Sequence, residues 1–337
     1  MRKRRIYVGN QEKKGVQEAK DIRQLFRQFV SIKVAEGVSE GTVNQYEDNF
    51  TFFCEYIESH GAQYYIDAIT STLIREWITY MQFDHVQFRK VAERKAKEVG
   101  LKPSTINTRL KTIRVMFNTL KRERVIEDNP FERISNVSEP EDRIEVLTDK
   151  ELVRLFSVMD KSYYAVYRDY VLTMFLLDTM LRITEATTVT QDDFDFDVDA
   201  GVVIIRASIA KNRKSRAVPV SKRVMRMINE LIKENEHTIF SDYVFVTDKG
   251  TPYDRHRYNK RMKDYAEMAH IKKSVHAHIF RHTAATAWLE NGGGMEELRL
   301  ILGHSKYEMV KRYTHVSSKS VVKAAEEFSI TSKFDFT

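Results

Sequence analysis

Apolar residues recur at helical spacing along most of this chain from about residue 20, and this periodicity constrains its fold more than any other feature. The clearest stripe follows Pro103 and consists of Ile106, Leu110, Ile113, Phe117 and Leu120. Residues three and four apart lie on one face of a helix, so such a stripe buries one side and leaves the other exposed. The pattern predicts a mainly α-helical protein.

One segment departs from the helical pattern. Val202–Ile205 reads as a short β-strand and Ala217–Val220 as a second, with the polar turn 211–215 between them. Pro219 has no backbone N–H to donate, which favours an edge strand. The sequence therefore predicts a small antiparallel β-sheet within an otherwise helical fold.

The length of the chain and one polar stretch predict two domains. A chain of 337 residues is too long for one ordinary core. Asn129-Pro130 stops the helical run, and the residues that follow are polar and nearly pattern-free. The predicted segments are a basic tail (1–19), a helical N-terminal domain (20–134), a linker (135–146), a mostly helical C-terminal domain (147–328) and a C-terminal tail (329–337).

Charge favours a polyanionic partner. Lys and Arg number 55 and Asp and Glu 48, which gives a formal net charge of +7. Nucleic acid or an anionic membrane surface would attract such a chain, whereas an even spread of the charge would mean only solubility.

There is one cysteine, Cys54, so no intramolecular disulfide can form. No apolar run is long enough to span a membrane or to form a signal peptide, which predicts a cytoplasmic protein.

Basic residues accompany the apolar stripe of the helix predicted after Pro103. Arg109, Lys111 and Arg114 lie off that stripe. An apolar stripe beside a basic face suits a helix that packs on its domain and faces a DNA backbone. A solvated basic face is an equally good interpretation of this helix taken alone.

Cations and imidazoles gather in the C-terminal half. His278 and Arg281 are three residues apart and share a helix face. Gly303 permits a tight turn, and we expect His304 at the start of a helix, where backbone N–H groups attract anions. Tyr313 follows nine residues after His304. Upstream, Arg182 ends an apolar helix predicted over 164–181.

A zinc site and a structural role are two other interpretations of these histidines. His278 and His282 have the i, i+4 spacing that zinc enzymes use. Arg281 stands between them, however, the glutamate of a zinc protease is missing, and no nearby Cys or Asp completes a ligand set. We therefore expect no metal. His282 precedes the small and apolar residues 283–288, and we interpret it as a residue that mainly holds the fold.

Together these motifs resemble the tyrosine recombinase (phage integrase) family. The resemblance rests on His278-x-x-Arg281-His282, Leu302-Gly303-His304, Tyr313, the segment 181–185 and the segment 211–219. The stretch from Ser104-Thr105-Ile106-Asn107-x-Arg109-Leu110 to Asn129-Pro130 also resembles the end of the family's core-binding domain. The resemblance extends from about residue 20 to about residue 330 and implies a SAM-like core-binding domain followed by a catalytic domain. Met180 stands where the family usually has glycine.

The resemblance implies a reaction and a role for each matching residue. Tyr313 would attack a DNA phosphodiester and form a covalent 3′-phosphotyrosine link, with Tyr307 as the weaker alternative. Arg182 and Arg281 would bind the non-bridging oxygens, which paired guanidinium donors suit, and His304 would add a hydrogen bond. His278 would help to take the tyrosine proton.

In the same family pattern, Lys211 would protonate the leaving 5′-oxygen, with Lys214 as the alternative acid and a further DNA contact. No cofactor is implied. The implied partners are double-stranded DNA and further copies of the chain, as a tetramer on two DNA sites.

Two other functions remain as alternatives. One is a DNA-binding relative that has lost catalysis, against which the complete residue set argues. The other is a type IB topoisomerase, which shares the chemistry but needs no partner site; the helical N-terminal domain and the length favour a recombinase. The sequence leaves open whether the reaction serves phage integration, transposon movement, or resolution of plasmids or chromosome dimers.

Overall fold

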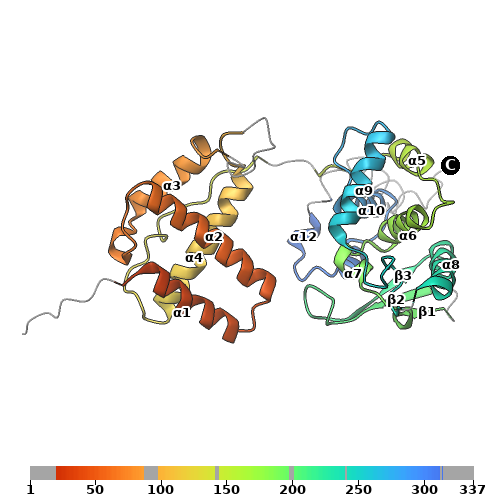
Figure 1. Ribbon diagram of the computed structural model, residues 1–337, viewed down its shortest axis with the longest axis horizontal. Coiled ribbons are helices and arrows are strands. Elements are labelled where there is room, and N and C mark those ends of the chain that lie inside the picture. The colour runs from red at the N-terminus through yellow and green to blue at the C-terminus, as the bar shows by residue number, and fades with distance from the viewer. Residues whose placement is uncertain are drawn as a thin grey trace, which may run out of the picture. The chain divides into compact units, whose positions relative to one another are not determined.

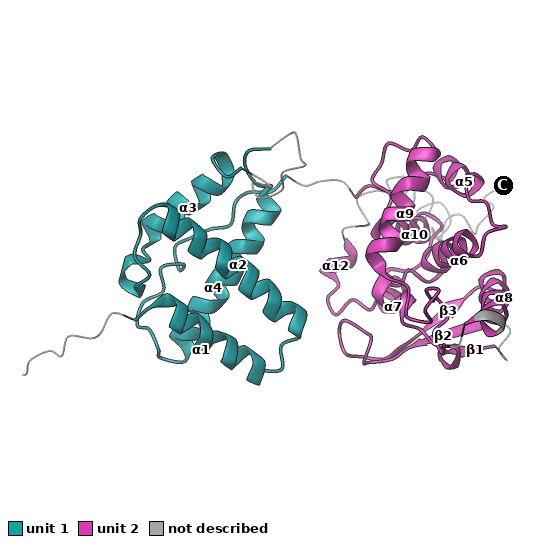
Figure 2. Ribbon diagram, viewed as in Figure 1, with its two compact units in different colours: residues 1–141 teal, residues 142–337 magenta. Residues whose placement is uncertain are grey.

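Two units make up the chain, residues 1–141 and 142–337 (Figure 2). The computed structural model describes residues 20–86, 98–140, 144–196, 201–239, 241–311 and 313. The predicted tails, 1–19 and 329–337, lie outside the described residues. Both units are mainly helical, which confirms the predicted fold class.

The described part of the N-terminal unit is a cluster of helices around one long helix (Figure 1). Its elements are α1 (Ile22–Ala35), α2 (Glu40–Ser59), the 3-10 turn η1 (Ile66–Ala68), α3 (Ser71–Phe83) and α4 (Pro103–Arg122). Pro103 occupies the first turn of α4, where its missing N–H costs nothing. The predicted stripe of α4 is fully buried, and α1, α2 and α3 all contact this helix.

Hydrogen bonds hold the backbone at both ends of the predicted linker. The side chain of Asn107 on α4 donates to the carbonyl of Val137 and accepts from its amide, both at 2.9 Å. Arg114, also on α4, donates to the carbonyl of Ile134 and to Asn136. At the other end the amide of Leu147 donates to Thr283 in the C-terminal unit. Polar side chains therefore bind backbone groups of linker residues that, where the structure describes them, have no secondary structure of their own.

The described part of the C-terminal unit contains eight α-helices and a small sheet. The helices are α5 (Asp149–Ser157), α6 (Tyr164–Thr179), α7 (Ile183–Thr187), α8 (Lys222–Thr238), α9 (Arg255–Met268), α10 (Ala277–Glu290), α11 (Met295–Leu302) and α12 (Glu308–Lys311). The strands, after the 3-10 turn η2 (Gln191–Asp193), are β1 (Phe194–Asp195), β2 (Gly201–Ile205) and β3 (Arg216–Val220).

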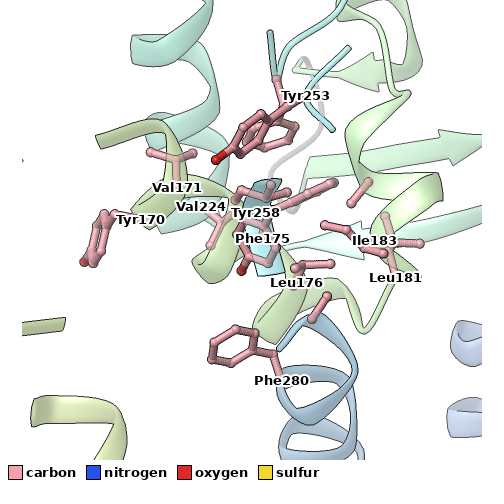
Figure 3. Close-up of a cluster of buried hydrophobic side chains, with 14 of the residues drawn as sticks. Tyr170, Val171, Phe175, Leu176, Leu181, Ile183, Val224, Tyr253, Tyr258 and Phe280 are labelled. Atoms are coloured by element: carbon pink, nitrogen blue, oxygen red, sulfur yellow. The ribbon is translucent and has the colours of Figure 1, made fainter. Parts of the chain in front are cut away.

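Helix α6 lies at the centre of this unit. It contacts α7, α8, α10 and strand β3, and most of its side chains are buried. Figure 3 shows Phe175 and Leu176 of α6 in the same apolar cluster as Tyr258 of α9 and Phe280 of α10. This shared core positions α10 relative to the end of α6, where the candidate active site lies.

The sheet has the order β1-β2-β3, with both pairs antiparallel. The two predicted strands are confirmed, and Val203 pairs with Val218. Pro219 lies on β3, at the edge of this sheet, as predicted. Strand β1 was not predicted, because two residues are too few to show the alternation that marks a strand.

The apolar helix predicted over 164–181 ends two residues earlier than expected. Met180 has φ 54° and ψ 25°, a left-handed conformation that terminates α6 at Thr179. This conformation is costly for a residue with a Cβ, but the Met180 side chain is buried in a cluster with Ala285 and Leu302. The turn directs the chain out of α6, so that Arg182 becomes the N-cap of α7.

Candidate active site

All six predicted catalytic residues lie in the C-terminal unit, either on α10 or in connections between its helices and strands. Arg182 caps α7, and Lys211 lies in the connection between β2 and β3. His278 and Arg281 are on α10. His304 follows α11 and Tyr313 follows α12.

Arg281 is a buried cation bound by the ends of two helices. Its guanidinium donates to the carbonyl of Met180 at 2.6 Å and to that of Leu302 at 2.8 Å. These carbonyls belong to the C-terminal ends of α6 and α11, whose last carbonyls lack partners within their own helix. The same guanidinium lies 3.1 Å from Nε2 of His304.

Electrostatics identify the surroundings of Arg281 as a place for an anion. The side chain is 4% exposed, and no carboxylate forms an ion pair with it among the described residues. Burial lowers the pKa of Arg281 to about 10, and the positive charge of Arg182 contributes to the same shift. A negative group bound here would relieve both effects.

Glu185 joins two further arginines. Its carboxylate accepts from the backbone amide and the guanidinium of Arg182 at 3.0 and 3.1 Å, and from Arg216 at 2.8 and 3.2 Å. The carboxylate is fully buried. Burial alone would raise the pKa of Glu185, but the hydrogen bonds and charges of Arg216 and Arg182 hold it below its ordinary value. Glu185 thus fixes the position of Arg182.

His304 does not begin a helix, and that expectation was wrong. Gly303 has φ 63° and caps the C-terminal end of α11, so His304 follows a helix end. A Cβ on Gly303 would lie only 3.1 Å from the guanidinium of Arg216. Glycine is therefore required here for its backbone conformation and for the close approach of Arg216, and the turn directs His304 to Arg281.

The β2–β3 connection is held against the end of α11. Asn212 donates to the carbonyl of Gly303, and Arg216 donates to that of Ile301. Sequence reasoning gave Arg216 no role; its place in the basic segment 211–216 was the available signal. Lys211 and Lys214 are both exposed on this connection.

His278 lies among cations. Partial burial lowers the pKa of this imidazole, and the positive charges of Arg281, His276, Arg182 and Lys211 add to the effect in that order. Lys211, Arg182 and Arg281 therefore all lie close enough to His278 to affect its pKa. A neutral imidazole at this position can accept or donate a hydrogen bond without adding to the positive charge.

Tyr313 is buried, with 1% of its surface exposed, and packs in a cluster that includes Met180 and Leu302. Its hydroxyl lies 2.9 Å from Nδ1 of His282. The interpretation of His282 as a residue that holds the fold missed this contact, because the two residues are 31 positions apart and no spacing within α10 points to Tyr313. Tyr307, the alternative nucleophile, is 42% exposed and its hydroxyl faces Met295.

The basic residues of α4 differ in their surroundings. The guanidinium of Arg109 stacks 3.6 Å above the ring of Phe52, and burial lowers its pKa. Arg114 is bound to the start of the linker, as described above. Lys111 is the exposed one of the three.

Among the residues that the structure describes, no group of three or more His, Cys, Asp or Glu side chains is arranged to hold a metal ion. No helix in those residues combines the length and the apolar character that crossing a membrane requires.

A helical N-terminal unit, followed by a unit that brings arginine, histidine and tyrosine together at the end of α6, defines a tyrosine recombinase. The family model for the phage integrase family matches residues 145–320, and that for the phage integrase SAM-like domain matches residues 21–137. The chain belongs to the phage integrase family.

Relatives and solved structures agree with this assignment. Tyrosine recombinase XerC of Bacillus subtilis is 29% identical over 79% of this chain and 91% of its own, and XerD of Vibrio cholerae is 27% identical over 88% and 92%. The fold is similar to that of the Tn1549 transposon integrase bound to a circular intermediate DNA, with a TM-score of 0.70, 20% identity and coverage of 91% and 99%. The XerH recombinase bound to difH has a TM-score of 0.68, 20% identity and coverage of 89% and 84%.

We predict that Glu185→Gln lowers the free energy of unfolding at neutral pH by about 3–5 kcal/mol, because two largely buried arginines lose their shared counter-charge. The pKa of Glu185 is held below its ordinary value in the folded protein. Its stabilising contribution is therefore present above the pKa of an unfolded glutamate, about 4.3, and is lost as the pH falls through the lower folded-state pKa.

Urea unfolding of wild type and variant, from pH 7 downward, measures this effect. The difference between the two proteins should be widest at neutral pH and should narrow in acid. Glu290→Gln, at an exposed position at the end of α10, is the matched control and should change little at any pH. A difference for Glu185→Gln that stays constant with pH would contradict the assigned role.

Proposed function

We propose that this protein is a site-specific DNA recombinase that cleaves and rejoins DNA through a covalent 3′-phosphotyrosine intermediate. It would act in integration and excision of a mobile element or in resolution of a replicon. The observation that carries this proposal is the buried Arg281, whose guanidinium lies 3.1 Å from Nε2 of His304 and close enough to Arg182 for the two charges to interact. Tyr313 packs in a cluster with Met180 and Leu302, the two residues whose carbonyls bind Arg281. Such a site binds an anion and holds a nucleophile next to it.

The proposed chemistry follows from where charge develops. Attack on a DNA phosphodiester makes phosphorus five-coordinate and increases the negative charge on its non-bridging oxygens. Arg182 and Arg281 stabilise these oxygens, and His304 adds a hydrogen bond. Preorganised cations do this without rearrangement, because Glu185 fixes Arg182 and the helix-end carbonyls fix Arg281.

Tyr313 supplies the nucleophilic oxygen, and Lys211 supplies the proton that the leaving 5′-oxygen needs. His278 contributes a neutral imidazole that hydrogen-bonds to the phosphate beside the two arginines. The link between tyrosine and the 3′-phosphate conserves the energy of the broken bond. A 5′-hydroxyl of a partner strand can then attack that link and release the tyrosine, so strand exchange needs no external energy source.

DNA is the partner that this chemistry requires, and the Tn1549 transposon integrase, which has a similar fold, binds a circular intermediate DNA. On α4, Lys111 is exposed and suited to a phosphate contact. Arg109 and Arg114 support that surface from half-buried positions, and Lys214 provides a further contact from the β2–β3 connection. The proposed reaction takes place in the cytoplasm, with the DNA.

We predict that wild-type protein forms a covalent adduct with DNA from the neighbourhood of its own gene, nicked near the crossover so that the cut strand diffuses away. Tyr313→Phe should form no detectable adduct, because it lacks the nucleophilic oxygen. Tyr307→Phe, at the exposed neighbouring tyrosine, is the matched control and should retain the adduct. A denaturing gel separates adduct from free protein.

The three proteins together decide the reaction class. An adduct that survives Tyr313→Phe and disappears in Tyr307→Phe would move the nucleophile to Tyr307. Tight DNA binding without any adduct in the wild type would favour a relative that binds DNA without cutting it. Relaxation of supercoiled DNA of arbitrary sequence by dilute protein would favour a topoisomerase.

We predict that Lys211→Ala slows adduct formation by about 100-fold or more on ordinary DNA, as expected for loss of a general acid. On DNA with sulfur in place of the leaving 5′-oxygen, the variant should approach the wild-type rate, because a thiolate leaves without protonation. Lys214→Ala, in the same connection, is the control and should show no such rescue. If the sulfur-containing DNA instead restores the rate of Lys214→Ala and not that of Lys211→Ala, Lys214 is the general acid.

We further propose a tetramer on two DNA sites, because exchange between two duplexes requires cleavage of four strands and each chain offers one Tyr313. Light scattering after size-exclusion chromatography, with two sites present, should give a mass of four chains per pair of duplexes. A complex that stays at two chains per pair under conditions of strand exchange would contradict this assembly.

A further inference from the structure

One contact of the proposed nucleophile is not explained by the roles given above. The hydroxyl of Tyr313 lies 2.9 Å from Nδ1 of His282, and the two ring centroids are 5.7 Å apart. This distance is that of a hydrogen bond between a phenol and an imidazole. His282 is partly buried and Tyr313 is almost completely buried.

Both partners of this contact are held by the fold. His282 follows Arg281 on α10, and Arg281 is bound to the ends of α6 and α11. Tyr313 packs in the cluster of Met180, Ala285 and Leu302. The next residue of α10, Thr283, accepts a hydrogen bond from the amide of Leu147. The imidazole is therefore presented to the phenol by a fixed helix, as a group that moves a proton must be.

His278 is less suited to receive the tyrosine proton. It lies one helical turn before His282, with a distance of 6.4 Å between ring centroids. The charges that face it come from Arg182, Lys211, His276 and Arg281. A positive charge on His278 would be repelled by the two arginines and by Lys211, which favours a neutral imidazole that hydrogen-bonds to the phosphate over one that accepts a proton.

We propose that His282 accepts the phenolic proton of Tyr313 during cleavage and returns it during rejoining. This inference rests on the proposed function. The Nδ1 lone pair takes the proton, and the O–H electron pair remains on the phenolate oxygen. That oxygen bonds to phosphorus while the bond to the 5′-oxygen breaks, and the 5′-oxygen takes a proton from Lys211. Rejoining reverses each transfer, so no further reactant is consumed.

The transfer is uphill in water, where a phenol has a pKa of about 10 and an imidazole one of about 6.5. The site lowers this cost, because a negative charge on Tyr313 interacts favourably with the cation of Arg281. Bonding of the phenolate to phosphorus then removes the charge. The acceptor role also requires that Nδ1 of His282 carry no proton and that Nε2 carry one.

The first test compares His282→Asn with His278→Asn in single-turnover adduct formation on the nicked DNA. Asparagine retains a hydrogen-bonding atom near the place of Nδ1 but cannot take a proton, so His282→Asn should slow the reaction by about 100-fold or more. Thermal unfolding of each variant, with His282→Gln as a second substitution, identifies any loss of fold. A rate for folded His282→Asn within about two-fold of wild type would overturn the proposal.

The second test separates proton transfer from positioning. Replacing Tyr313 with a trifluorotyrosine gives a more acidic phenol, which needs less help to ionise. Fluorination should raise the rate of adduct formation by His282→Asn at least about ten-fold more than it raises the wild-type rate. It should not raise the rate of His278→Asn in the same way. Equal effects of fluorination in wild type and His282→Asn would leave His282 as a positioning residue and overturn its role as proton acceptor.

The controls distinguish failure of this inference from failure of the proposed function. If wild type forms no adduct, the proposed function fails and the role of His282 falls with it. If wild type forms the adduct, Tyr313→Phe does not, and His282→Asn reacts as wild type does, the proposed function stands and His282 is not the acceptor.

Discussion

The candidate active site depends on one buried guanidinium that joins the ends of two helices. Arg281 donates to the last carbonyls of α6 and α11 and contacts His304. Helix ends leave such carbonyls unpaired, and a cation there also interacts favourably with the helix dipoles. The same side chain therefore holds the ends of α6 and α11 together and supplies positive charge to the candidate site. Arginine suits both tasks, because its planar head offers several donors at once.

The two backbone turns that surround Arg281 follow from this constraint. Met180 and Gly303 both adopt left-handed conformations just after α6 and α11. Each turn ends its helix at a point where the last carbonyl accepts a hydrogen bond from Arg281. Shortly after each turn the chain reaches a site residue, Arg182 after Met180 and His304 after Gly303. Glycine accepts this conformation without strain, whereas Met180 compensates for it by burying its side chain against Ala285 and Leu302. A methionine can therefore stand where glycine is usual in the family.

Local pattern predicted the elements well, and the long-range contacts of the site poorly. The stripe of α4 and the strands β2 and β3 were visible because their periodicity lies within a few residues. The resemblance supplied the site residues as a set. The contact between His282 and Tyr313 spans 31 positions, and that between Arg216 and Glu185 also spans 31. Such pairs are created by packing, so no periodicity records them. The position of His304 was mispredicted because Gly303 suits a helix end as well as a turn before a helix.

The distribution of charge explains how one small region both folds and binds an anion. Arg182 and Arg216 share the buried carboxylate of Glu185, whereas Arg281 is bound to neutral carbonyls and an imidazole. A carboxylate on Arg281 would stabilise the free protein more, but it would occupy the donors that a phosphate needs. Burial lowers the pKa of Arg281 to about 10, which is still far above neutral pH, so the cation persists. In the proposed function, a phosphodiester bound here would supply the missing negative charge and stabilise the site at the point where the reaction develops its own negative charge.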